Sequence, residues 1–438
     1  MNTDTIHRLF HFLKKSPSAF HAVRTISELL LADGYHELLE SESWNITPGG
    51  KYFVSRNGSS IIAFHTGKVS WDYGFQICAS HSDSPTFKLK EHAELEVRGK
   101  YTQLNTEGYG GMLCSTWFDR PLSIAGRVVI KKEHSYQVQL LDIDRDLLLI
   151  PSLAIHMNRQ ANDGFSYNKQ IDLLPLFTDS ACTQNSFRRF LASELKFSED
   201  SIYGTDLYLY NRSEPSLWGK NMEFLSAPRL DNLECAYASL MGFLHGAPQN
   251  TINVYACFDN EEVGSGTRQG AGSSFLYDVL HRINDALGKN GEDYQKAVAR
   301  SFLISADNAH AVHPNHPEKT DTANCVYMNQ GVVIKSHAGQ KYTSDAVSIA
   351  IFRALCEQAH VPVQFFSNRS DQAGGSTLGN ISSQKVPVRA VDVGLAQLSM
   401  HSAYETAGAK DVEDMIRVME TFYQSCVRIN GEGGFSLS

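Results

Sequence analysis

The spacing of apolar and polar residues changes along the chain and predicts where helices and strands lie. Near the start, apolar side chains recur at helical spacing over residues 6–13 and again over 23–30. Short apolar runs at 51–54, 60–65 and 74–80 have the length of strands. The first part of the chain therefore contains a pair of helices followed by the first strands of a sheet.

From about residue 221 onward, helical and strand patterns alternate. Helices are expected at 233–244, 274–287, 344–358 and 412–426, and strands at 252–258, 302–305, 332–335, 361–366 and 388–394. This alternation predicts an α/β fold with a mostly parallel central sheet that helices cover on both faces. Ligands of such sheets bind at the carboxyl ends of the strands.

A middle segment, from about residue 90 to 220, has a different character. Short strand-like runs at 93–97, 122–129 and 136–141 are separated by turn residues, and few helical patterns occur. We therefore predict an α/β domain built from residues 1–88 and 223–438, interrupted by an inserted β-rich domain over 89–222.

Composition excludes some classes of function. Of the 438 residues, 42% are hydrophobic and 20% charged, with a net charge of −9, so nucleic acid is not an expected partner. No run approaches the ~18 apolar residues that span a bilayer. No signal peptide is apparent either, so we expect no membrane association and a cytoplasmic location. The 8 cysteines form no Cys-x-x-Cys pair, which indicates free thiols in a reducing compartment.

Two adjacent carboxylates provide the strongest chemical signal. Glu261 and Glu262 follow directly after the predicted buried strand at 252–258. Because neighbouring side chains point in different directions at a strand end, one carboxylate can bind a metal while the other reaches a water on that metal.

Other potential metal ligands lie in loops, mostly after predicted strands. They are the imidazoles and carboxylates of His81, Asp83, Asp231, Asp307 and His401. A two-metal hydrolase needs a carboxylate between its cations, an imidazole and a further carboxylate on each, and a free carboxylate that takes a proton from the attacking water. The sequence supplies these residue types at suitable places.

Each residue also has a plain structural explanation when taken alone. Asp231 and Asp307 could cap helices. His81 could lie in a surface loop, and His401 could be a half-buried histidine. The structural explanation weakens for the whole set. Several unrelated residues would all have to lie at suitable positions and be of metal-ligand types by chance.

Several stretches together resemble the aspartyl aminopeptidase family of co-catalytic zinc aminopeptidases. The residues that carry the resemblance are His81-Ser82-Asp83-Ser84-Pro85, Pro228-Arg229-Leu230-Asp231-Asn232-Leu233, Asp259-Asn260-Glu261-Glu262-Val263-Gly264-Ser265, the segment from Asp307 to Asn315, and Met400-His401-Ser402. The similarity covers nearly the whole chain.

The resemblance implies a role for each residue of the site. Asp231 bridges two Zn²⁺ ions, with Mn²⁺ or Co²⁺ as plausible substitutes. The remaining ligands are His81 and Asp307 at one ion, and Glu262 and His401 at the other. Glu261 is the general base and acid, and Asp83 orients His81.

The resemblance also implies a zinc-peptidase-like fold, an inserted dimerisation domain and a substrate. Family substrates are peptides with a free N-terminus, preferably Asp or Glu, and Lys335 is the cation expected to hold that acidic side chain. Tyr342 is expected near the reacting carbonyl, and His156 is expected to reach the site of a neighbouring subunit. Family members form homo-oligomers, dodecamers built from dimers.

Two other functions stay open. A related two-metal carboxypeptidase or N-acyl amino acid deacylase would use similar ligands but a different substrate end. A non-enzymatic scaffold with a vestigial site is the third hypothesis, and the complete set of expected residues argues against it.

Overall fold

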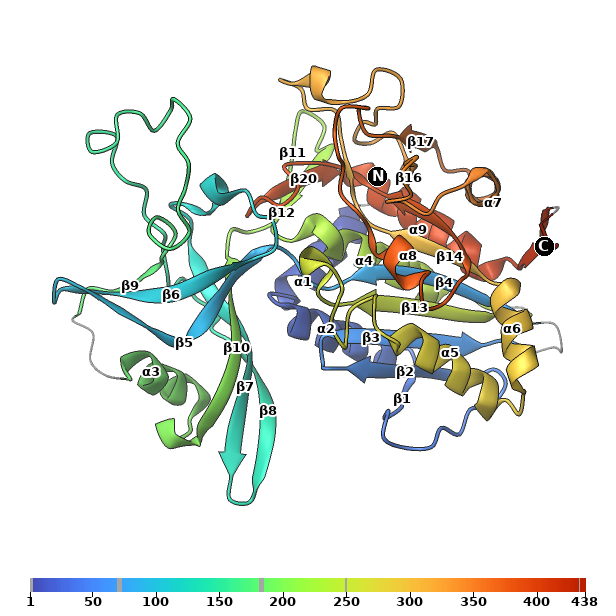
Figure 1. Cartoon of the computed structure of the whole chain (residues 1–438), viewed down its shortest axis with the longest axis horizontal. Helices are drawn as coiled ribbons and strands as arrows, with labels where there is room; N and C mark the ends of the chain where they lie inside the picture. Colours follow the sequence, from blue (N-terminus) through green and yellow to red (C-terminus); the bar gives the residue numbers. More distant parts are fainter. Residues whose placement is uncertain (1–2, 69–72, 181–184, 249, 433) are drawn as a thin grey trace.

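A computed structural model of the chain describes residues 3–68, 73–180, 185–248, 250–432 and 434–438. The described residues form an α/β unit built on a nine-stranded sheet, a six-stranded antiparallel sheet that extends away from it, and a smaller five-stranded sheet between them (Figure 1). The α/β class predicted from the alternating pattern is confirmed.

The nine-stranded sheet has the order β1-β2-β3-β13-β4-β14-β18-β16-β17. Its strands are β1 (His36–Glu37), β2 (Lys51–Arg56), β3 (Ser60–Thr66), β4 (Phe75–His81), β13 (Ile252–Phe258), β14 (Phe302–Ala306), β16 (Val332–Lys335), β17 (Val363–Phe366) and β18 (Arg389–Gly394). Strands β13, β4, β14 and β18 run parallel to one another, so their carboxyl ends meet at one edge. The runs expected at 252–258 and 332–335 match β13 and β16 residue for residue.

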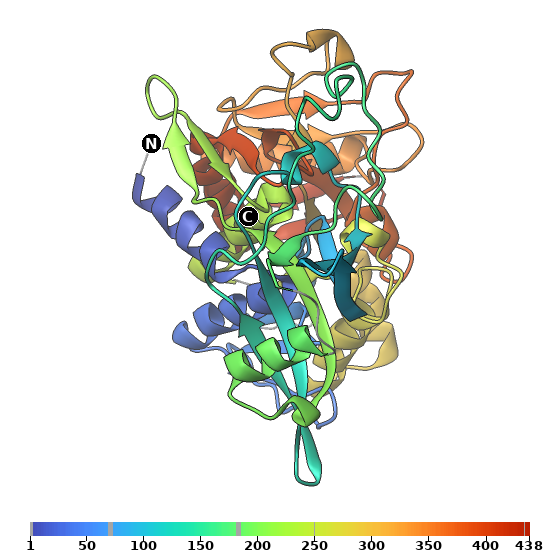
Figure 2. The ribbon, with the colours of Figure 1, turned by 90° about the vertical axis from the view of Figure 1, so that its left-hand side faces the viewer.

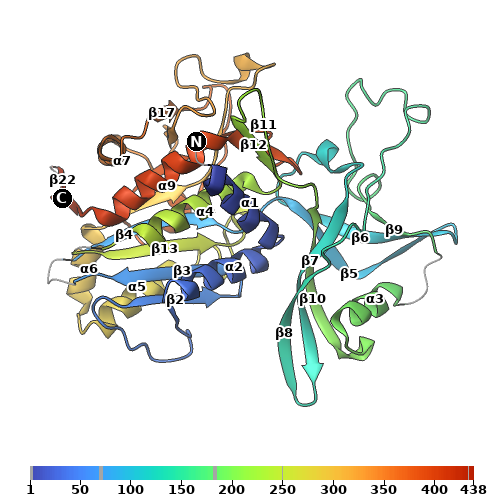
Figure 3. The same ribbon diagram turned by 180° about the vertical axis from the view of Figure 1, so that it is seen from behind.

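Helices cover both faces of this sheet. Those on one face are α1 (Thr3–Lys15), α2 (Ala19–Ala32), α4 (Leu230–His245), α7 (Ala346–Ala359) and α9 (Ala409–Gln424) (Figure 3). Those on the other face are α5 (Phe275–Ala286), α6 (Gly291–Ala299) and the short α8 (Leu378–Ser382) (Figure 1). Because both faces are covered, β4, β13 and β14 in the middle of the sheet are buried at every residue rather than at alternate ones.

Helices α4 and α9 pack against each other at Gly242. A Cβ atom on Gly242 would lie 2.4 Å from the Cβ of Met419, closer than real side chains approach. The glycine therefore allows the backbone of α4, which begins near the candidate site, to sit directly on α9.

The six-stranded sheet has the order β8-β7-β10-β5-β6-β9. Its elements are β5 (Thr86–Val97), β6 (Tyr101–Tyr109), β7 (Leu122–Lys132), β8 (Ser135–Asp142), β9 (Leu176–Thr178) and β10 (Ile202–Asn211), accompanied by α3 (Ser186–Leu195) and the short 3₁₀ turns η1 (Cys114–Trp117) and η2 (Glu199–Ser201). Figure 2 shows the long β7–β8 hairpin reaching well beyond the rest of the chain. The β-rich segment predicted at 89–222 falls on this sheet.

The five-stranded sheet was not expected from the sequence. Its order is β11-β12-β20-β19-β15. The strands are β11 (Ser216–Trp218), β12 (Phe224–Ala227), β15 (Ala309–His310), β19 (Ala396–Leu398) and β20 (Glu405–Gly408), and a separate hairpin is formed by β21 (Val427–Ile429) and β22 (Phe435–Leu437). These strands are only two to four residues long, too short for a pattern to be read from apolar spacing.

All seven described cysteines are free thiols, and Cys182 lies outside the described residues. None of the described helices combines the length and the apolar character needed to cross a bilayer.

Candidate metal centre

Three of the candidate segments lie at the ends of adjacent parallel strands. His81 is the last residue of β4, Glu261 and Glu262 form the turn η3 (Glu261–Val263) after β13, and Asp307 follows β14. Because β4 lies between β13 and β14 in the sheet, these side chains gather at one point of its carboxyl edge.

The other two candidate ligands come from outside that sheet. Asp231 lies in the first turn of α4, where its non-helical φ and ψ of −82° and 107° break the regular helix. His401 lies in the loop between β19 and β20. The five-stranded sheet thus brings a late segment of the chain over the carboxyl edge of the main sheet.

The Asp231 carboxylate lies between two imidazoles. Its Oδ1 is 3.6 Å from Nε2 of His81, and its Oδ2 is 3.4 Å from Nε2 of His401. The two oxygens of one carboxylate therefore face two different histidines.

Each histidine also faces one further carboxylate. Nε2 of His81 is 3.7 Å from Oδ1 of Asp307, and Nε2 of His401 is 3.3 Å from Oε2 of Glu262. The five residues predicted as ligands thus fall into two groups that share Asp231.

The donor set fits divalent cations. Oδ1 of Asp231 and Oε1 of Glu262 are buried and have no hydrogen-bond partner among the described residues. Potential ligand atoms of His81, Asp231 and Glu262 all lie within 4.8 Å of one another. Burial, followed by the charge of Asp231, raises the pKa of Glu262 well above its usual range. Buried carboxylates that converge without hydrogen bonds need a cation to remain ionised, and imidazole with carboxylate suits zinc.

Asp83 connects His81 to the Glu261–Glu262 turn. Its backbone oxygen lies 3.1 Å from Nδ1 of His81, while its carboxylate accepts the backbone N–H groups of Glu261 and Glu262, each at 3.1 Å. Burial alone would raise the pKa of Asp83, but the hydrogen bond and charge of His81 outweigh it and lower that pKa. The predicted orienting residue therefore also fixes the backbone of the turn.

Glu261 differs from the candidate ligands around it. Among the described residues, its side chain has no hydrogen-bond or ion-pair partner. Burial raises its pKa to about 8, and although the charge of His81 opposes this, the nearby carboxylates, first Asp307, add to the rise. The group is thus poised to hold or release a proton near neutral pH.

Sequence patterns gave no sign of three groups that support the ligands. The buried carboxylate of Glu405 accepts the backbone N–H of Asp231 at 3.0 Å and that of His401 at 2.8 Å. The Tyr109 hydroxyl donates to Asp83 at 2.7 Å. The carbonyl oxygen of Gly111 lies 2.9 Å from Nδ1 of His401. Tyr109 and Gly111 lie in the segment predicted as an insertion, where nothing in the local pattern indicates metal chemistry.

Lys335 and Tyr342 lie beside the cluster. The Lys335 ammonium is almost fully buried, donates to the backbone oxygen of Asp307 at 2.7 Å and lies 3.5 Å from Oδ2 of that residue. It also lies 5.3 Å from the centre of the buried Tyr342 ring. The positive charge is therefore directed at a candidate ligand, and its contact with a substrate stays a prediction.

His156 is not brought to the cluster within one chain. It lies in an exposed irregular loop between β8 and β9. Its predicted role needs a second copy of the chain.

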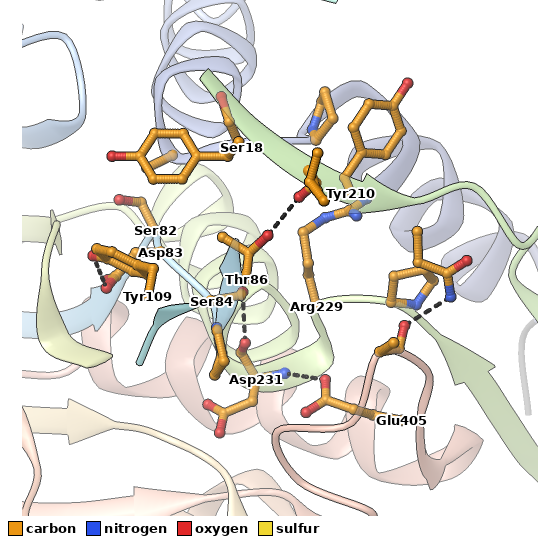
Figure 4. A pocket seen from close by; sticks show the side chains of 18 of the residues that line it. Ser18, Ser82, Asp83, Ser84, Thr86, Tyr109, Tyr210, Arg229, Asp231 and Glu405 are labelled. Atoms are coloured by element: carbon orange, nitrogen blue, oxygen red, sulfur yellow. Dashed lines mark hydrogen bonds between the residues drawn. The ribbon is translucent and has the colours of Figure 1, made fainter. Parts of the chain in front are cut away.

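A cavity is lined by Asp231, by Ser18 just before α2 and by Tyr210 of β10 (Figure 4). The Ser84 hydroxyl donates to the backbone oxygen of Asp231 at 2.8 Å, and the Arg229 guanidinium donates to the backbone oxygen of Leu13 at 3.0 Å. Since Leu13 lies near the end of α1, Arg229 ties that helix to the segment that carries Asp231.

Comparison with known proteins shows the family of this chain. The family model described as "Aminopeptidase I zinc metalloprotease (M18)" matches residues 12–423. The chain belongs to the M18 family. M18 is the aspartyl aminopeptidase family, so the resemblance seen in the motifs is confirmed, and the chain is a member of a family of metal-dependent aminopeptidases.

M18 relatives match along nearly their whole length. A probable M18 family aminopeptidase 2 from Clostridium novyi is 45% identical over 424 residues, which cover 95% of this chain and 98% of the relative. The cryo-EM structure of the Ape4 and Nbr1 complex contains a chain with a TM-score of 0.92 and 36% identity, covering 96% of this chain and 86% of that one. The S. cerevisiae mApe1 dodecamer gives a TM-score of 0.84 at 26% identity, with 97% of each chain covered. The predicted zinc-peptidase fold is thereby confirmed.

Proposed function

We propose that this chain removes the N-terminal residue from peptides, preferably Asp or Glu, at a centre of two zinc ions. The observation that carries the proposal is the position of Asp231, whose two carboxylate oxygens face His81 and His401 separately, at 3.6 and 3.4 Å. A carboxylate between two imidazoles is the arrangement that two neighbouring cations require.

The remaining ligands divide between the two ions. His81 and Asp307 would complete one site, and Glu262 and His401 the other, with Asp231 shared. When bound, the ions polarise the scissile carbonyl and lower the pKa of the attacking water.

Glu261 is assigned the proton transfers. Its carboxylate would take a proton from the attacking water and deliver it to the nitrogen of the departing amine. The absence of hydrogen-bond and ion-pair partners for its side chain among the described residues supports this role, because a carboxylate engaged as a ligand could not accept the proton.

The negative charge of the site suits a substrate with a free N-terminus. A positively charged amino group is attracted by the carboxylates of Glu262 and Asp307, whereas an acylated nitrogen carries no charge. Lys335 is assigned the acidic side chain of the first residue, and the Tyr342 hydroxyl would donate to the oxyanion that develops on the scissile carbonyl.

We further propose that the chain works as an oligomer built from dimers, a dodecamer, in the cytoplasm. A relative, S. cerevisiae mApe1, has been solved as a dodecamer. In this proposal the segment 89–222 is the dimerisation domain of the chain, and His156 of a neighbouring copy reaches the site. The exposed loop that carries His156 also exposes Ile155 and Met157, which supports a contact surface there.

A substrate panel with metal analysis of the same sample tests the function. We expect release of the first residue from free peptides, faster with Asp or Glu than with Ala, and two metal ions per chain by mass spectrometry of the acid-digested protein. N-acetylated peptides should not react. Release of a C-terminal residue, or cleavage of N-acyl amino acids, would instead support the carboxypeptidase or deacylase alternative.

The assignment of Lys335 has a test of its own. If Lys335 holds the acidic side chain, Lys335→Met should lower kcat/KM for Asp substrates about tenfold or more relative to Ala substrates. An equal loss for both, reversed by added zinc, would show that Lys335 only positions Asp307.

A further inference from the structure

A second cavity, of about 350 Å³, opens beside the metal centre. Its base includes His310 of β15 and Gln397 of β19, which pair directly in the five-stranded sheet. His310 follows Asp307 by three residues, and Ser399, which also lines the cavity, precedes His401 by two. The cavity therefore lies between the two loops that carry candidate ligands of different ions.

The lining contains hydrogen-bond donors and no acidic residue. The residues that line it are His310, Ala311, His313, Lys319, Thr320, Phe366, Ser367, Asn368, Arg369, Gln372, Gly374, Gln397, Leu398 and Ser399. With Lys319 and Arg369 in the lining and no Asp or Glu, the lining side chains carry a net positive charge on a chain whose net charge is −9.

Several of these donors have no protein partner. Gln397 is 1% exposed, and its Nε2 has no hydrogen-bond partner among the described residues, although its Oε1 accepts from Asn308 at 2.9 Å. Nδ2 of Asn368 is likewise buried without a partner. Because an unmade buried hydrogen bond costs on the order of 1–3 kcal/mol, such donors are expected to meet an acceptor in the working protein.

Two cations line the cavity, Arg369 and Lys319. The Lys319 ammonium, at the end of η4 (Pro317–Lys319), has no hydrogen bond or ion pair among the described residues. Arg369, by contrast, is held by the Asp371 carboxylate, with Nε at 2.9 Å and one terminal nitrogen at 2.7 Å. Lys319 is thus the lining cation available for a ligand.

We propose that this cavity binds a carboxylate of the peptide on the far side of the scissile bond, with Lys319 as its cation and the amides of Gln397 and Asn368 as further donors. The inference rests on the proposed aminopeptidase function. Lys335 and Tyr342, which are assigned to the first residue of the substrate, do not line the cavity. The cavity is therefore available to the later residues of the peptide. The carboxylate can be an acidic side chain or the C-terminus of a short peptide.

Four substrates with the same first residue test the proposal. They are the aspartyl anilide, which has only a neutral aromatic ring beyond the scissile bond, Asp-Ala-Ala-amide, Asp-Glu-Ala-amide and the free acid Asp-Ala. We expect kcat/KM for at least one carboxylate-bearing peptide to exceed that of Asp-Ala-Ala-amide about tenfold. The Glu-containing amide reports a side-chain carboxylate, and the free dipeptide reports a terminal one.

Lys319→Met should remove this preference and leave the anilide and the neutral amide within about twofold of the parent chain. Lys319→Arg should retain it. Lys385→Met, which changes an exposed lysine outside the cavity, is the matched control.

Two results would overturn the proposal: no preference for either carboxylate in the parent chain, or a Lys319→Met loss that is equal for the anilide. Failure of the proposed function itself looks different, since the parent chain would then cleave none of the four substrates.

Discussion

Asp83 illustrates at the scale of one residue how the site is held together. One side chain and its backbone oxygen contact the His81 ring and both N–H groups of the Glu261–Glu262 turn. A proposed ligand of each of the two proposed ions, His81 and Glu262, and the proposed proton carrier Glu261 therefore share one support.

Replacing Glu261 by Gln separates proton transfer from metal binding. We expect turnover to fall by roughly 100- to 10,000-fold, because the amide cannot take a proton from water. Metal content per chain and thermal stability should stay unchanged in Glu261→Gln. The control is Glu292→Gln, which changes an exposed residue of α6 and should leave activity unchanged. Normal turnover in Glu261→Gln would remove Glu261 from the mechanism.

Glu405 is expected to act through the ligands that it supports. In Glu405→Gln, one of the two backbone N–H groups, of Asp231 or of His401, would face an amide NH₂ instead of an oxygen. Zinc affinity should fall about 10- to 100-fold, as is typical for groups that support ligands. Activity measured across zinc buffers should recover at high free zinc; a loss that zinc cannot restore would argue for a direct role in the reaction.

At the scale of secondary-structure elements, the sequence predicted most of the α/β unit, including the four-residue β16. It gave no counterpart for α6 or for β6, β10 and α3 of the middle segment. The pattern over 412–426 predicts a helix because one stripe of α9 is buried, including Met415, Met419 and Phe422. Strands β15, β19 and β20 have no such signal, since two to four residues do not define a period. They nevertheless place His401, so the candidate ligand could be named from its motif, while the means of bringing it to Asp231 could not.

The same limit applies to the supporting residues. Glu405 and Tyr109 act through hydrogen bonds to segments far apart in the sequence, and their local patterns are those of ordinary strands. Only the folded chain shows which backbone groups they reach.

The contact between α4 and α9 gives a prediction about stability. Gly242→Ala forces a methyl group into the backbone of α9 around Met419, so we expect a loss of about 1–3 kcal/mol in the free energy of unfolding. Urea denaturation measures it. The control is Gly291→Ala at the start of α6, where an added Cβ would meet no neighbouring atom within 4 Å. We expect it to be neutral or slightly stabilising. An equal change in the free energy of unfolding for both variants would show that α4 and α9 can move apart at Gly242 without loss of stability.

At the scale of the whole molecule, the exposed apolar side chains concentrate away from the α/β unit. The irregular loop between β8 and β9 exposes Leu153, Ile155, Met157 and Ile171, and the edge strand β8 exposes Val138. Both lie in the arm, our name for the segment 89–222 that extends away from the α/β unit. An edge strand and an exposed apolar loop are features that a partner surface normally covers.

Introducing charged side chains into the loop between β8 and β9 should therefore weaken assembly. For Ile155→Glu with Met157→Glu we expect the concentration needed for oligomers to rise about tenfold or more, measured by light scattering after size-exclusion chromatography. Activity should fall with the oligomer if His156 of a neighbour contributes. Leu31→Glu, an exposed apolar residue on α2, is the matched control. Unchanged assembly in the double variant would exclude this loop as a contact surface.

The hydrogen-bonding distance of 2.9 Å between the His401 ring and the Gly111 carbonyl has a consequence for anyone who wishes to shorten the protein. Gly111 lies beyond β6, in the arm that projects from the α/β unit, so excising that arm to obtain a minimal enzyme would strip His401 of the acceptor that sets its ring orientation. A trimmed chain could keep every side chain proposed to bind metal and still hold the ion proposed at His401 poorly.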